Sequence, residues 1–404
     1  MSTYYCLLGN TPDLSAAEIA AFFPDAPQEL ILPHILKLEI EGELDTSELL
    51  YFLGGTVKLL KELTPLEMEI ARDEDKLAEA LADQFMRAVP EGKITFGIAE
   101  HGRDHLPRLE AAYIKSLLQK QDVTAKYYED SRTGLSAAIL IHHPKVVELH
   151  IIQTAEQVVI ARTVAVQDIE EWTYRDREKP YFDRKKGMLP PKVSRMMANI
   201  GLGTLLKLRG DKQSLPTSSN KTLNGQYLLY DPFCGTGTVL AEALLTGANV
   251  VGSDSDAVAV KGTQANLQWL EKKYDVEERY KVFTSEVANV PPTQLPSKID
   301  VIVTEPFLGK PTPRPVELPN IFKGLEKLYW GAFRKWTQIL QAPAVIVIIF
   351  PVVESEKHTF TLENLIDKLA PLGYTILSEP IIYRRPQAVV QRQICLFSFN
   401  PVQK

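Results

Sequence analysis

The segment DPFCGTGT, from Asp231 to Thr238, contains the residue types needed to hold a small ligand. It lies between an apolar stretch that predicts a strand and a stretch with helical spacing. Gly235 and Gly237 let the backbone come close to a ligand, and the following helix offers free N–H groups and the positive end of its dipole. The segment lacks the GKS or GKT ending of a P-loop and the third glycine of a dinucleotide fingerprint. It therefore predicts a site for a small ligand with a carboxylate and no pyrophosphate.

An acidic residue follows this turn at the spacing that nucleoside-binding folds use. The segment VVGSD places Asp254 at the end of the next expected strand, about 20 residues after the turn. A carboxylate there can accept hydrogen bonds from both hydroxyls of a ribose. A plain glycine turn followed by an exposed aspartate is the alternative interpretation, and it leaves the joint occurrence of turn, spacing and acid unexplained.

From Gln226 onward, apolar strand candidates alternate with helical stretches. The expected strands are Tyr227–Tyr230, Asn249–Gly252, Lys281–Phe283, Asp300–Thr304, Ala344–Phe350, Thr375–Ile381 and Gln393–Phe399. The expected helices are Thr238–Leu245, Ala257–Lys272 and Phe322–Leu340. This alternation predicts a doubly wound, mostly parallel sheet covered by helices, with the glycine turn after its first strand.

Residues 1–60 mix short strand candidates with one helix candidate, and residues 60–165 predict an α+β module. A connector rich in charge and proline follows at 166–200. The expected strands are Tyr4–Leu8, Leu36–Ile40, Ile94–Ile98, Leu135–Ile141 and Val146–Gln153, and the expected helices are Ser15–Phe23, 74–89 and Leu109–Gln119. The polar stretch Lys207–Gly225 predicts a loop.

The composition is that of an ordinary folded protein, with 45% hydrophobic and 24% charged residues among 404. The longest apolar run, Ala342–Val353, is too short to span a bilayer, and the N-terminus lacks the pattern of a secretory signal. The three cysteines lie far apart, which argues against a disulfide framework and favours a reducing, cytoplasmic compartment. Residues 1–100 hold 7 Lys/Arg and 19 Asp/Glu, whereas the remaining residues hold 38 and 32. Such acidity argues against non-specific nucleic-acid binding but leaves room for a local basic groove.

Four segments together resemble the class I S-adenosylmethionine methyltransferases, and more narrowly the THUMP-domain tRNA guanosine-N2 methyltransferases of the position-10 type. They are Tyr4–Ile19, Val158–Pro180, Gly187–Ile200, and the pair formed by DPFCGTGT and VGSD. The resemblance implies a Rossmann-like class I methyltransferase domain preceded by an α+β N-terminal region with a THUMP-like domain. It divides the chain into a ferredoxin-like segment (1–60), a THUMP-like RNA-binding domain (61–165), a basic connector with the cofactor-side helix (166–200) and the methyltransferase domain (201–404).

The same resemblance implies S-adenosylmethionine as cofactor and the exocyclic N2 amine of a guanosine in tRNA as methyl acceptor, in the cytoplasm. No DNA and no membrane partner is expected, and the need for a small activating protein stays open. Carried over by position, the cofactor residues are Asp231, Pro232, Phe233, Gly235, Gly237 and Thr238 of the turn, Leu189 and Pro190 at the methionine end, Asp254 at the ribose, and Ser255 and Glu286 at the adenine.

The chain departs from this family at the fourth strand, where the family has Asp-Pro-Pro-Tyr and this sequence has Glu305-Pro306-Phe307-Leu308-Gly309. A guanine amine is a poor nucleophile because its lone pair is delocalised into the ring, so a carboxylate must aim it at the methyl group. Glu305 keeps the carboxylate, but its extra methylene can move the oxygens by about 1 Å, which costs roughly 100-fold if nothing compensates. Three interpretations stay open. Phe307 stacks on the base in place of the tyrosine, or the site has lost its catalytic activity, or Glu305 is only a solvated residue at the end of the strand.

Basic residues interleaved with aromatic ones in the connector predict an RNA-binding surface. The candidates are Arg175, Arg177, Lys179, Arg184, Lys185 and Lys186, joined near the C-terminus by Arg384, Arg385 and Arg392. A solvated linker is an equally good interpretation of the first group, and capping of sheet ends is an equally good one for the second.

The histidines and Cys234 do not predict chemistry of their own. The pairs His101/His105 and His142/His143 lack the companion carboxylates or cysteines of a zinc site, so no metal is expected. Cys234 has no histidine pattern to activate it and is interpreted as a small packing residue.

Three functions stay open. They are methylation of guanosine N2 in tRNA, a catalytically inactive relative that binds cofactor and RNA as a subunit or RNA chaperone, and methyl transfer to an adenine or cytosine amine. The THUMP-like region argues against a DNA substrate.

Overall fold

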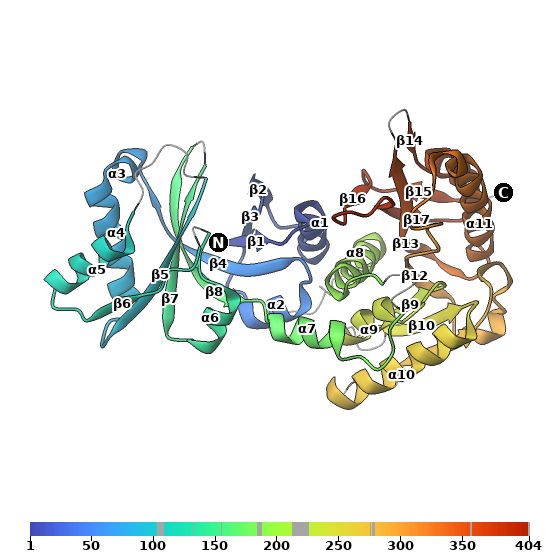
Figure 1. Ribbon diagram of the computed structural model, residues 1–404, viewed down its shortest axis with the longest axis horizontal. Helices are drawn as coiled ribbons and strands as arrows, with labels where there is room; N and C mark the ends of the chain where they lie inside the picture. Colours follow the sequence, from blue (N-terminus) through green and yellow to red (C-terminus); the bar gives the residue numbers. More distant parts are fainter. Residues whose placement is uncertain are drawn as a thin grey trace. The chain divides into compact units, whose positions relative to one another are not determined.

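The computed structural model describes residues 1–102, 109–131, 133–154, 156–183, 188–211, 226–274, 276, 279–355 and 358–402. The chain forms two compact units, whose elements are labelled in Figure 1. Unit 1 comprises Met1–Pro12, Asp25–Tyr51 and Gly55–Glu171, and unit 2 comprises Asp13–Pro24, Phe52–Gly54 and Trp172–Lys404. A short N-terminal helical segment therefore belongs to the C-terminal unit.

Unit 1 is built on one eight-stranded sheet in the order β2-β3-β1-β4-β8-β7-β5-β6. The strands are β1 (Ser2–Leu8), β2 (Gln28–Leu32), β3 (Ile35–Ile40), β4 (Thr56–Leu66), β5 (Ile94–His101), β6 (Ala125–Tyr127), β7 (Val146–Gln153) and β8 (Val158–Val166). β4 pairs with both β1 and β8. The boundary expected between residues 60 and 61 thus falls inside a strand, and the two N-terminal parts share a single sheet.

Helices α4 (Glu74–Ala88) and α5 (Ala111–Lys120) lie along one face of this sheet (Figure 1). The Asp73 carboxylate accepts a hydrogen bond from the Lys76 N–H at 3.1 Å and so caps the start of α4. Leu77, Leu81 and Phe85 follow at helical spacing and are buried against the sheet. The remaining helices are α2 (Thr46–Phe52), α3 (Met68–Arg72) and α6 (Ala137–His142).

The strand expected over Leu135–Ile141 is wrong, because the chain forms helix α6 there. Both backbone groups of Leu135 are taken by side chains: its N–H donates to Glu148 Oε1 at 2.6 Å, and its carbonyl accepts from Lys58 Nζ at 2.7 Å. With these groups occupied the residue cannot join a strand ladder, and the alanines and leucine that follow have high helix propensity.

Unit 2 contains a nine-stranded sheet in the order β11-β10-β9-β12-β13-β17-β15, with β14 paired to β13 and β16 paired to β17. The strands are β9 (Leu228–Asp231), β10 (Asn249–Asp254), β11 (Tyr280–Thr284), β12 (Ile299–Thr304), β13 (Leu340–Glu354), β14 (Thr359–Phe360), β15 (Tyr374–Ile376), β16 (Ile381–Tyr383) and β17 (Gln391–Phe399). The first five are parallel and β17 is antiparallel to β13. The predicted doubly wound, mostly parallel sheet is confirmed.

The last part of the sheet differs from expectation in one place. The single strand expected over Thr375–Ile381 is divided into β15 and β16. Pro380 lies between them, and proline has no N–H to donate to a strand ladder.

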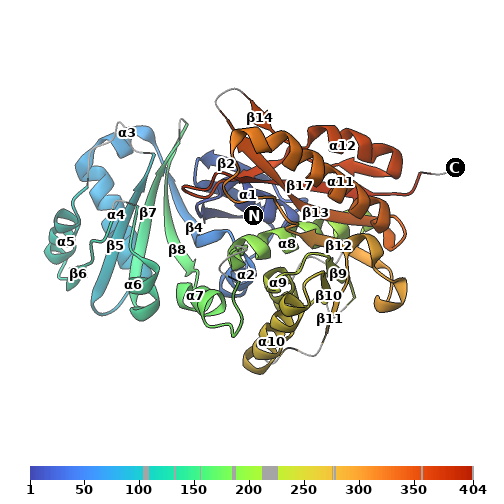
Figure 2. The ribbon, with the colours of Figure 1, turned by 45° about the vertical axis from the view of Figure 1, so that its right-hand side comes forward.

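Helices cover both faces of the sheet of unit 2 (Figures 1 and 2). They are α8 (Pro191–Arg209), α9 (Thr238–Leu245), α10 (Ala257–Tyr274), α11 (Leu318–Trp336) and α12 (Glu363–Leu369). Helix α7 (Ile169–Arg177) begins in unit 1 and ends in unit 2. Val301 and Ile302 are consecutive residues of β12. Val301 faces α8, since a Cβ on Gly201 of that helix would lie 2.8 Å from Val301 Cγ1. Ile302 packs in the hydrophobic cluster that contains Phe333 of α11. Alternate residues of β12 therefore face opposite helix layers.

Helix α1 (Pro12–Phe22) is fixed to α8 by buried polar groups. Glu18 Oε1 accepts hydrogen bonds from the Gly54 N–H at 2.9 Å and from Asn199 Nδ2 at 2.7 Å. A Cβ on Gly203 would lie 2.4 Å from the Ala21 carbonyl oxygen, so only glycine allows this close approach of the two helices. Of the described helices, none is long and apolar enough to cross a bilayer.

A buried polar network links strands β4, β7 and β5 of unit 1. Lys58 Nζ on β4 lies 2.8 Å from both carboxylate oxygens of Glu148 on β7. Glu148 Oε2 lies 3.0 Å from His150 Nε2, and His150 Nδ1 lies 2.9 Å from His101 Nε2 on β5. Burial lowers the pKa of His101 to about 3 and also lowers that of His150. Burial raises the pKa of Glu148, but its contacts with His150 and Lys58 outweigh this and keep it below its ordinary value.

We expect unit 1 to lose stability between pH 6.5 and pH 5. The unfolded histidines bind protons below about pH 6.5, whereas folded His101 does so only near pH 3. The free energy of unfolding therefore falls with decreasing pH by about 1.4 kcal/mol per pH unit for each such histidine. Hydrogen exchange of the amides in β5 and β7, corrected for intrinsic exchange rates, measures this slope.

Two variants separate this effect from the rest of the chain. His101→Phe keeps a stacked ring and removes one titrating group, so its slope is expected to be shallower by about 1.4 kcal/mol per pH unit. His34→Phe changes an exposed histidine of the same unit and is expected to leave the slope unchanged. An unaltered slope in His101→Phe contradicts the assignment.

Candidate functional site

The glycine turn between β9 and α9 has a backbone that only glycine adopts easily. Gly235 and Gly237 have φ angles of +51° and +79°, in the left-handed region. A Cβ on Gly237 would lie 2.6 Å from Thr263 Cγ2, and the Thr263 hydroxyl donates to the Gly235 carbonyl at 2.7 Å. The Cys234 N–H donates to the Ser253 carbonyl at 3.0 Å, which fixes the turn to the neighbouring strand β10. The turn is therefore rigid and can present its backbone to a ligand.

Asp231, the last residue of β9, is a buried carboxylate. Its Oδ1 accepts hydrogen bonds from the Thr304 hydroxyl at 2.6 Å and from the Phe233 N–H at 3.1 Å. Burial raises the pKa of Asp231 to about 7, more than these hydrogen bonds lower it, and the charges of Asp254 and Glu305 raise it further. Three carboxylates thus converge at the carboxyl ends of β9, β10 and β12.

Asp254 and Glu286 stand at the carboxyl ends of the adjacent strands β10 and β11. The Asp254 carboxylate accepts hydrogen bonds from the N–H groups of Gly235 and Asp256, each at 3.0 Å. A carboxylate has about four acceptor positions, so Asp254 keeps capacity for further donors. Ser255 is exposed beside it, and Glu286 is exposed and accepts from Asn289 Nδ2 at 3.0 Å. The residues predicted for ribose and adenine therefore lie at one edge of the sheet.

Glu305 follows β12 directly, and its carboxylate is held by an arginine that the sequence left ambiguous. Arg392 on β17 donates through Nε to Glu305 Oε1 at 2.5 Å, and both side chains are largely buried, with 11% and 17% exposure. The sequence predicts RNA phosphate or a sheet end as the partner of Arg392, and the structure instead places its guanidinium on the Glu305 carboxylate. No local pattern in the sequence links these two residues, which are 87 positions apart.

The loop after Glu305 and Pro306 presents an aromatic ring to solvent. The Phe307 side chain is 64% exposed, and its carbonyl accepts a hydrogen bond from the buried Tyr329 hydroxyl at 2.7 Å. Gly309 has φ +91°, and a Cβ there would lie 2.9 Å from Ile321 Cγ2. The backbone of this loop is thus fixed against α11 while the Phe307 ring stays accessible.

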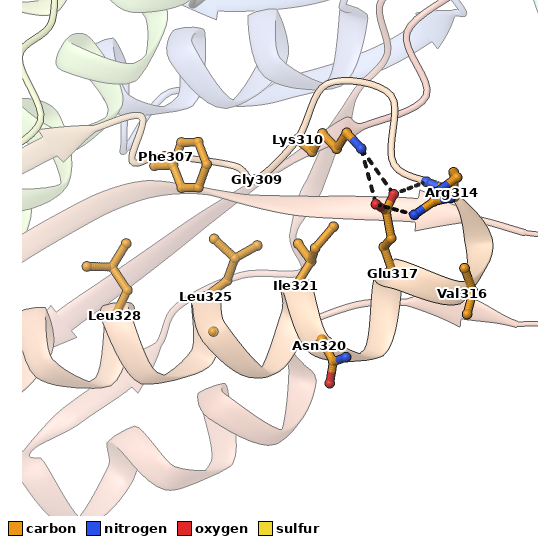
Figure 3. A pocket seen from close by; sticks show the side chains of 11 residues that line it. Phe307, Gly309, Lys310, Arg314, Val316, Glu317, Asn320, Ile321, Leu325 and Leu328 are labelled. Atoms are coloured by element: carbon orange, nitrogen blue, oxygen red, sulfur yellow. Dashed lines mark hydrogen bonds and ion pairs between the residues drawn. The ribbon is translucent and has the colours of Figure 1, made fainter.

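An open pocket of about 730 Å³ lies beside this loop. Its apolar lining includes Phe307, Val316, Ile321, Leu325 and Leu328. Figure 3 shows the three α11 side chains of this set pointing toward the loop. At one end of the pocket, Lys310 and Arg314 pair with Glu317 at 3.2 Å and 3.1 Å. The pocket could receive a flat apolar group next to the exposed Phe307 ring.

Two of the basic residues predicted to contact RNA are buried, which corrects that expectation. Arg175 donates through Nε to Glu242 Oε1 at 2.9 Å, and its guanidinium lies 4.1 Å from the Trp172 ring centre. Lys179 is also buried, with Nζ 3.4 Å from the Thr238 hydroxyl. Side chains in such places cannot follow an RNA backbone, because phosphate contacts require exposed cations.

The other predicted basic residues differ in their surroundings. Arg177 is exposed. Arg384 is exposed and pairs with Glu354 at 2.8 Å. Arg385 donates to the Met188 carbonyl, just before Leu189 and Pro190 at the start of α8. Arg184, Lys185 and Lys186 lie outside the described residues, as do His105 and most of the stretch Lys207–Gly225.

The glycine turn and the Glu305–Gly309 loop follow β9 and β12, which are neighbours in the sheet. The order of strands along the chain reverses between these two, and ligands of open α/β sheets bind beyond the strand ends at such a point. Residues 221–351 match the family described as RMKL-like, methyltransferase domain. This part of the chain is a methyltransferase domain.

Two archaeal proteins are similar to the chain over part of its length. The tRNA (guanine(10)-N2)-dimethyltransferase of Methanothermobacter thermautotrophicus is 30% identical over 214 residues, which cover 53% of this chain and 51% of that protein. The protein of the same name from Methanocaldococcus jannaschii is 29% identical over 183 residues, which cover 42% and 44%. The chain thus spans about half the length of the curated relatives it matches.

Solved structures share the fold over the whole chain. TrmN from Thermus thermophilus has a TM-score of 0.53 and 14% identity, with 99% of this chain and 100% of that one covered. SMU.472, whose crystal structure is complexed with SAH, has a TM-score of 0.52 and 11% identity, with both chains covered completely. At such identities the likeness concerns the fold, and the predicted class I methyltransferase fold is confirmed.

The absence of a side chain at Gly237 is expected to contribute to the stability of the methyltransferase domain. We expect Gly237→Ala to lower the free energy of unfolding by about 2–4 kcal/mol, because left-handed backbone and the contact with Thr263 both penalise a Cβ. Gly331→Ala on α11 is the matched control. It has no atom within 4 Å of the added Cβ and is expected to stabilise the helix by up to about 1 kcal/mol. Urea unfolding followed by tryptophan fluorescence measures both, and equal effects would contradict this role.

Proposed function

We propose that this protein transfers a methyl group from S-adenosylmethionine to the exocyclic N2 amine of a guanosine in tRNA. The observation that carries the proposal is the position of Glu305 and Phe307, which follow β12 directly, on the strand beside the glycine turn. The curated relatives over this part of the chain, named tRNA (guanine(10)-N2)-dimethyltransferases, support the choice of acceptor.

The residues of the turn suit this cofactor. Gly235 and Gly237 give a backbone that a ligand can approach, and Asp254 stands where the two hydroxyls of a ribose can donate to it. Glu286, at the end of the next strand, is available to the adenine amine. When bound, S-adenosylmethionine supplies a methyl group activated by the positive sulfur.

Glu305 is the residue that orients the acceptor in this proposal. Its carboxylate accepts a hydrogen bond from the guanine N2–H, which turns the weak nitrogen lone pair toward the methyl group. Arg392 binds the Oε1 atom and limits the positions that the longer side chain can adopt. Methyl transfer leaves one proton in excess on the nitrogen, and the same carboxylate can accept it.

Phe307 and unit 1 account for RNA binding in this proposal. The exposed Phe307 ring stacks on the guanine once the base leaves the RNA stack. Unit 1 acts as the THUMP-like part that binds folded tRNA by shape rather than by sequence. Arg177 and Arg384 are the described basic candidates that remain exposed. A cytoplasmic location follows from a tRNA substrate.

The direct test uses the purified protein, labelled S-adenosylmethionine and unmodified tRNA, with the digested nucleosides identified by mass spectrometry. N2-methylguanosine or its dimethyl form supports the proposal. Methylated adenine or cytosine overturns the acceptor and retains the methyltransferase. If cofactor binding is intact and no product forms with any tRNA, the inactive relative replaces the proposal.

We expect Glu305→Gln to lower kcat/KM for tRNA by about 100-fold, because the amide no longer accepts hydrogen bonds on both atoms and loses its charge. Cofactor affinity should change less than about threefold, since this carboxylate faces the acceptor. Glu326→Gln, which removes a carboxylate paired with Lys368 on the surface, is the control and should retain full activity. Wild-type turnover by Glu305→Gln would refute the orienting role.

For Phe307→Ala we expect a rise of roughly 10- to 100-fold in KM for tRNA, the size of one lost base-stacking contact. Phe307→Tyr keeps a stacking ring and should stay within about threefold of wild type. Because the side chain is 64% exposed, neither change should alter the melting temperature, and differential scanning calorimetry checks this. Equal KM values for the alanine and tyrosine variants would exclude stacking.

A further inference from the structure

The pocket beside helix α11 has one wall in common with the proposed acceptor site. That wall is the Phe307 ring, and three apolar side chains of α11 point toward the same loop (Figure 3). Phe307 and Val316, which also lines the pocket, are 64% and 76% exposed. Exposed apolar side chains gathered around a pocket are typical of a binding site. Among the described residues, the lining does not include Glu305, so its occupant is a group next to the guanine amine rather than the amine itself.

The loop that closes the pocket is stiff before any ligand binds. Its φ angles are restricted at four prolines, which are Pro306, Pro311, Pro313 and Pro315. Glu317 fixes the far end of the loop, because its carboxylate accepts a hydrogen bond from the Arg314 N–H at 2.7 Å and one from Lys310 Nζ at 3.2 Å. A pocket that is already formed loses little conformational entropy when it binds a ligand.

The end of the pocket at Glu317 is positively charged. The side chains of Lys310 and Arg314 are 52% and 74% exposed, and the two cations share the Glu317 carboxylate. This arrangement leaves an excess of one positive charge. The Arg314 guanidinium has five N–H donors and contacts Glu317 through Nη2, so it can bind this carboxylate and a phosphate oxygen at the same time.

We propose that this pocket binds the base of a nucleotide next to the acceptor guanosine in the RNA chain, with the phosphate of that nucleotide on Lys310 and Arg314. The inference rests on the proposed function and adds a second nucleotide site to it. A base has flat apolar faces and its phosphate is negative, which matches apolar walls with a basic end. Because Phe307 belongs to both places, an RNA whose guanine stacks on this ring brings the neighbouring nucleotide to the pocket.

An apolar segment of a partner protein is a poorer occupant than a nucleotide. Such a segment matches the walls but leaves the excess positive charge at Lys310 and Arg314 without a counterpart. It would also compete with the RNA for the Phe307 ring, which the pocket shares with the acceptor site. A nucleotide of the same RNA satisfies both requirements.

Gly324 allows the pocket to be filled without removing any of its side chains. It lines the pocket, and a Cβ there would have no atom within 4 Å. Gly324→Trp therefore adds a large ring to the pocket, and tryptophan has a better helix propensity than glycine. Gly331 on the same helix also has open space at its Cβ and is not part of the lining, so Gly331→Trp is the matched control. Thermal unfolding checks that both variants are as stable as wild type.

The test measures kcat/KM for N2 methylation on the complete, unmodified tRNA and on two tRNAs with an abasic nucleotide. The methylated guanosine is first located by mass spectrometry of RNase fragments, and the abasic nucleotide is then placed on its 5′ or its 3′ side. We expect wild type to lose about 10- to 100-fold on one of the two abasic tRNAs, the size of one base-stacking contact.

Gly324→Trp should lose a similar factor on the complete tRNA. On the abasic tRNA that wild type uses poorly, the variant should stay within about threefold of wild type, because both changes remove the same contact. Gly331→Trp should match wild type on all three tRNAs.

A second measurement tests the phosphate contact at the basic end. Arg314→Gln should reduce the slope of log binding constant for tRNA against log salt concentration by about 0.7 to 0.9, the effect of one lost phosphate contact. Arg334→Gln changes an exposed arginine in the last turn of α11 and should keep the wild-type slope. Equal slopes for Arg314→Gln and wild type contradict the inference.

Three further outcomes overturn it. Full wild-type activity on both abasic tRNAs, or full activity of Gly324→Trp on the complete tRNA, removes the neighbouring base from the pocket and leaves the proposed function intact. An equal loss by Gly324→Trp on all three tRNAs shows that the pocket holds something other than this base. Formation of no N2-methylguanosine by wild type refutes the proposed function and the inference together.

Discussion

The hydrogen bond from the Thr304 hydroxyl to the Asp231 carboxylate joins the two strands on which the rest of the site depends. It connects the ends of β12 and β9 at the point where the strand order reverses. Asp231 also holds the Phe233 N–H and so sets the start of the glycine turn. Because the carboxylate is buried, loss of either donor would remove one of the two hydrogen bonds that compensate its burial. The glycine turn and the Glu305 loop are therefore positioned by one shared group rather than independently.

Buried charges are used differently at different places in this chain. In unit 1, Lys58 is matched by Glu148 on the next strand but one, and in unit 2, Arg175 and Arg195 share Glu242. These ions have partners within the chain, so they fix the packing of strands and helices rather than bind ligands. The Glu305–Arg392 pair differs in its place, because it lies at the end of the strand next to the glycine turn.

The glycine turn and the alternation of strands and helices were predictable because both depend on local sequence patterns. The spacing from DPFCGTGT to Asp254 indicates the turn, and the apolar runs indicate the strands. The helix at Ala137–His142 was not predictable, because side chains of distant residues occupy the Leu135 backbone, and no window of sequence contains that information. The pairing of Glu305 with Arg392 was missed for the same reason, since a register between β13 and β17 brings them together. Basic residues of the connector such as Arg175 were predicted to be exposed to solvent. That prediction failed because a run of charged residues does not indicate which of its side chains are buried.

Arg392 limits the movement of the Glu305 side chain, which follows the fourth strand. A longer side chain at this position loses precision only if its carboxylate is free to move, and here Oε1 is held at 2.5 Å by a guanidinium on β17. Arg392 pairs in register with Pro351, near the end of β13, so it reaches Glu305 across one strand. In the proposed function, Glu305 and Arg392 therefore act together, because the arginine restricts the positions that the longer carboxylate can adopt.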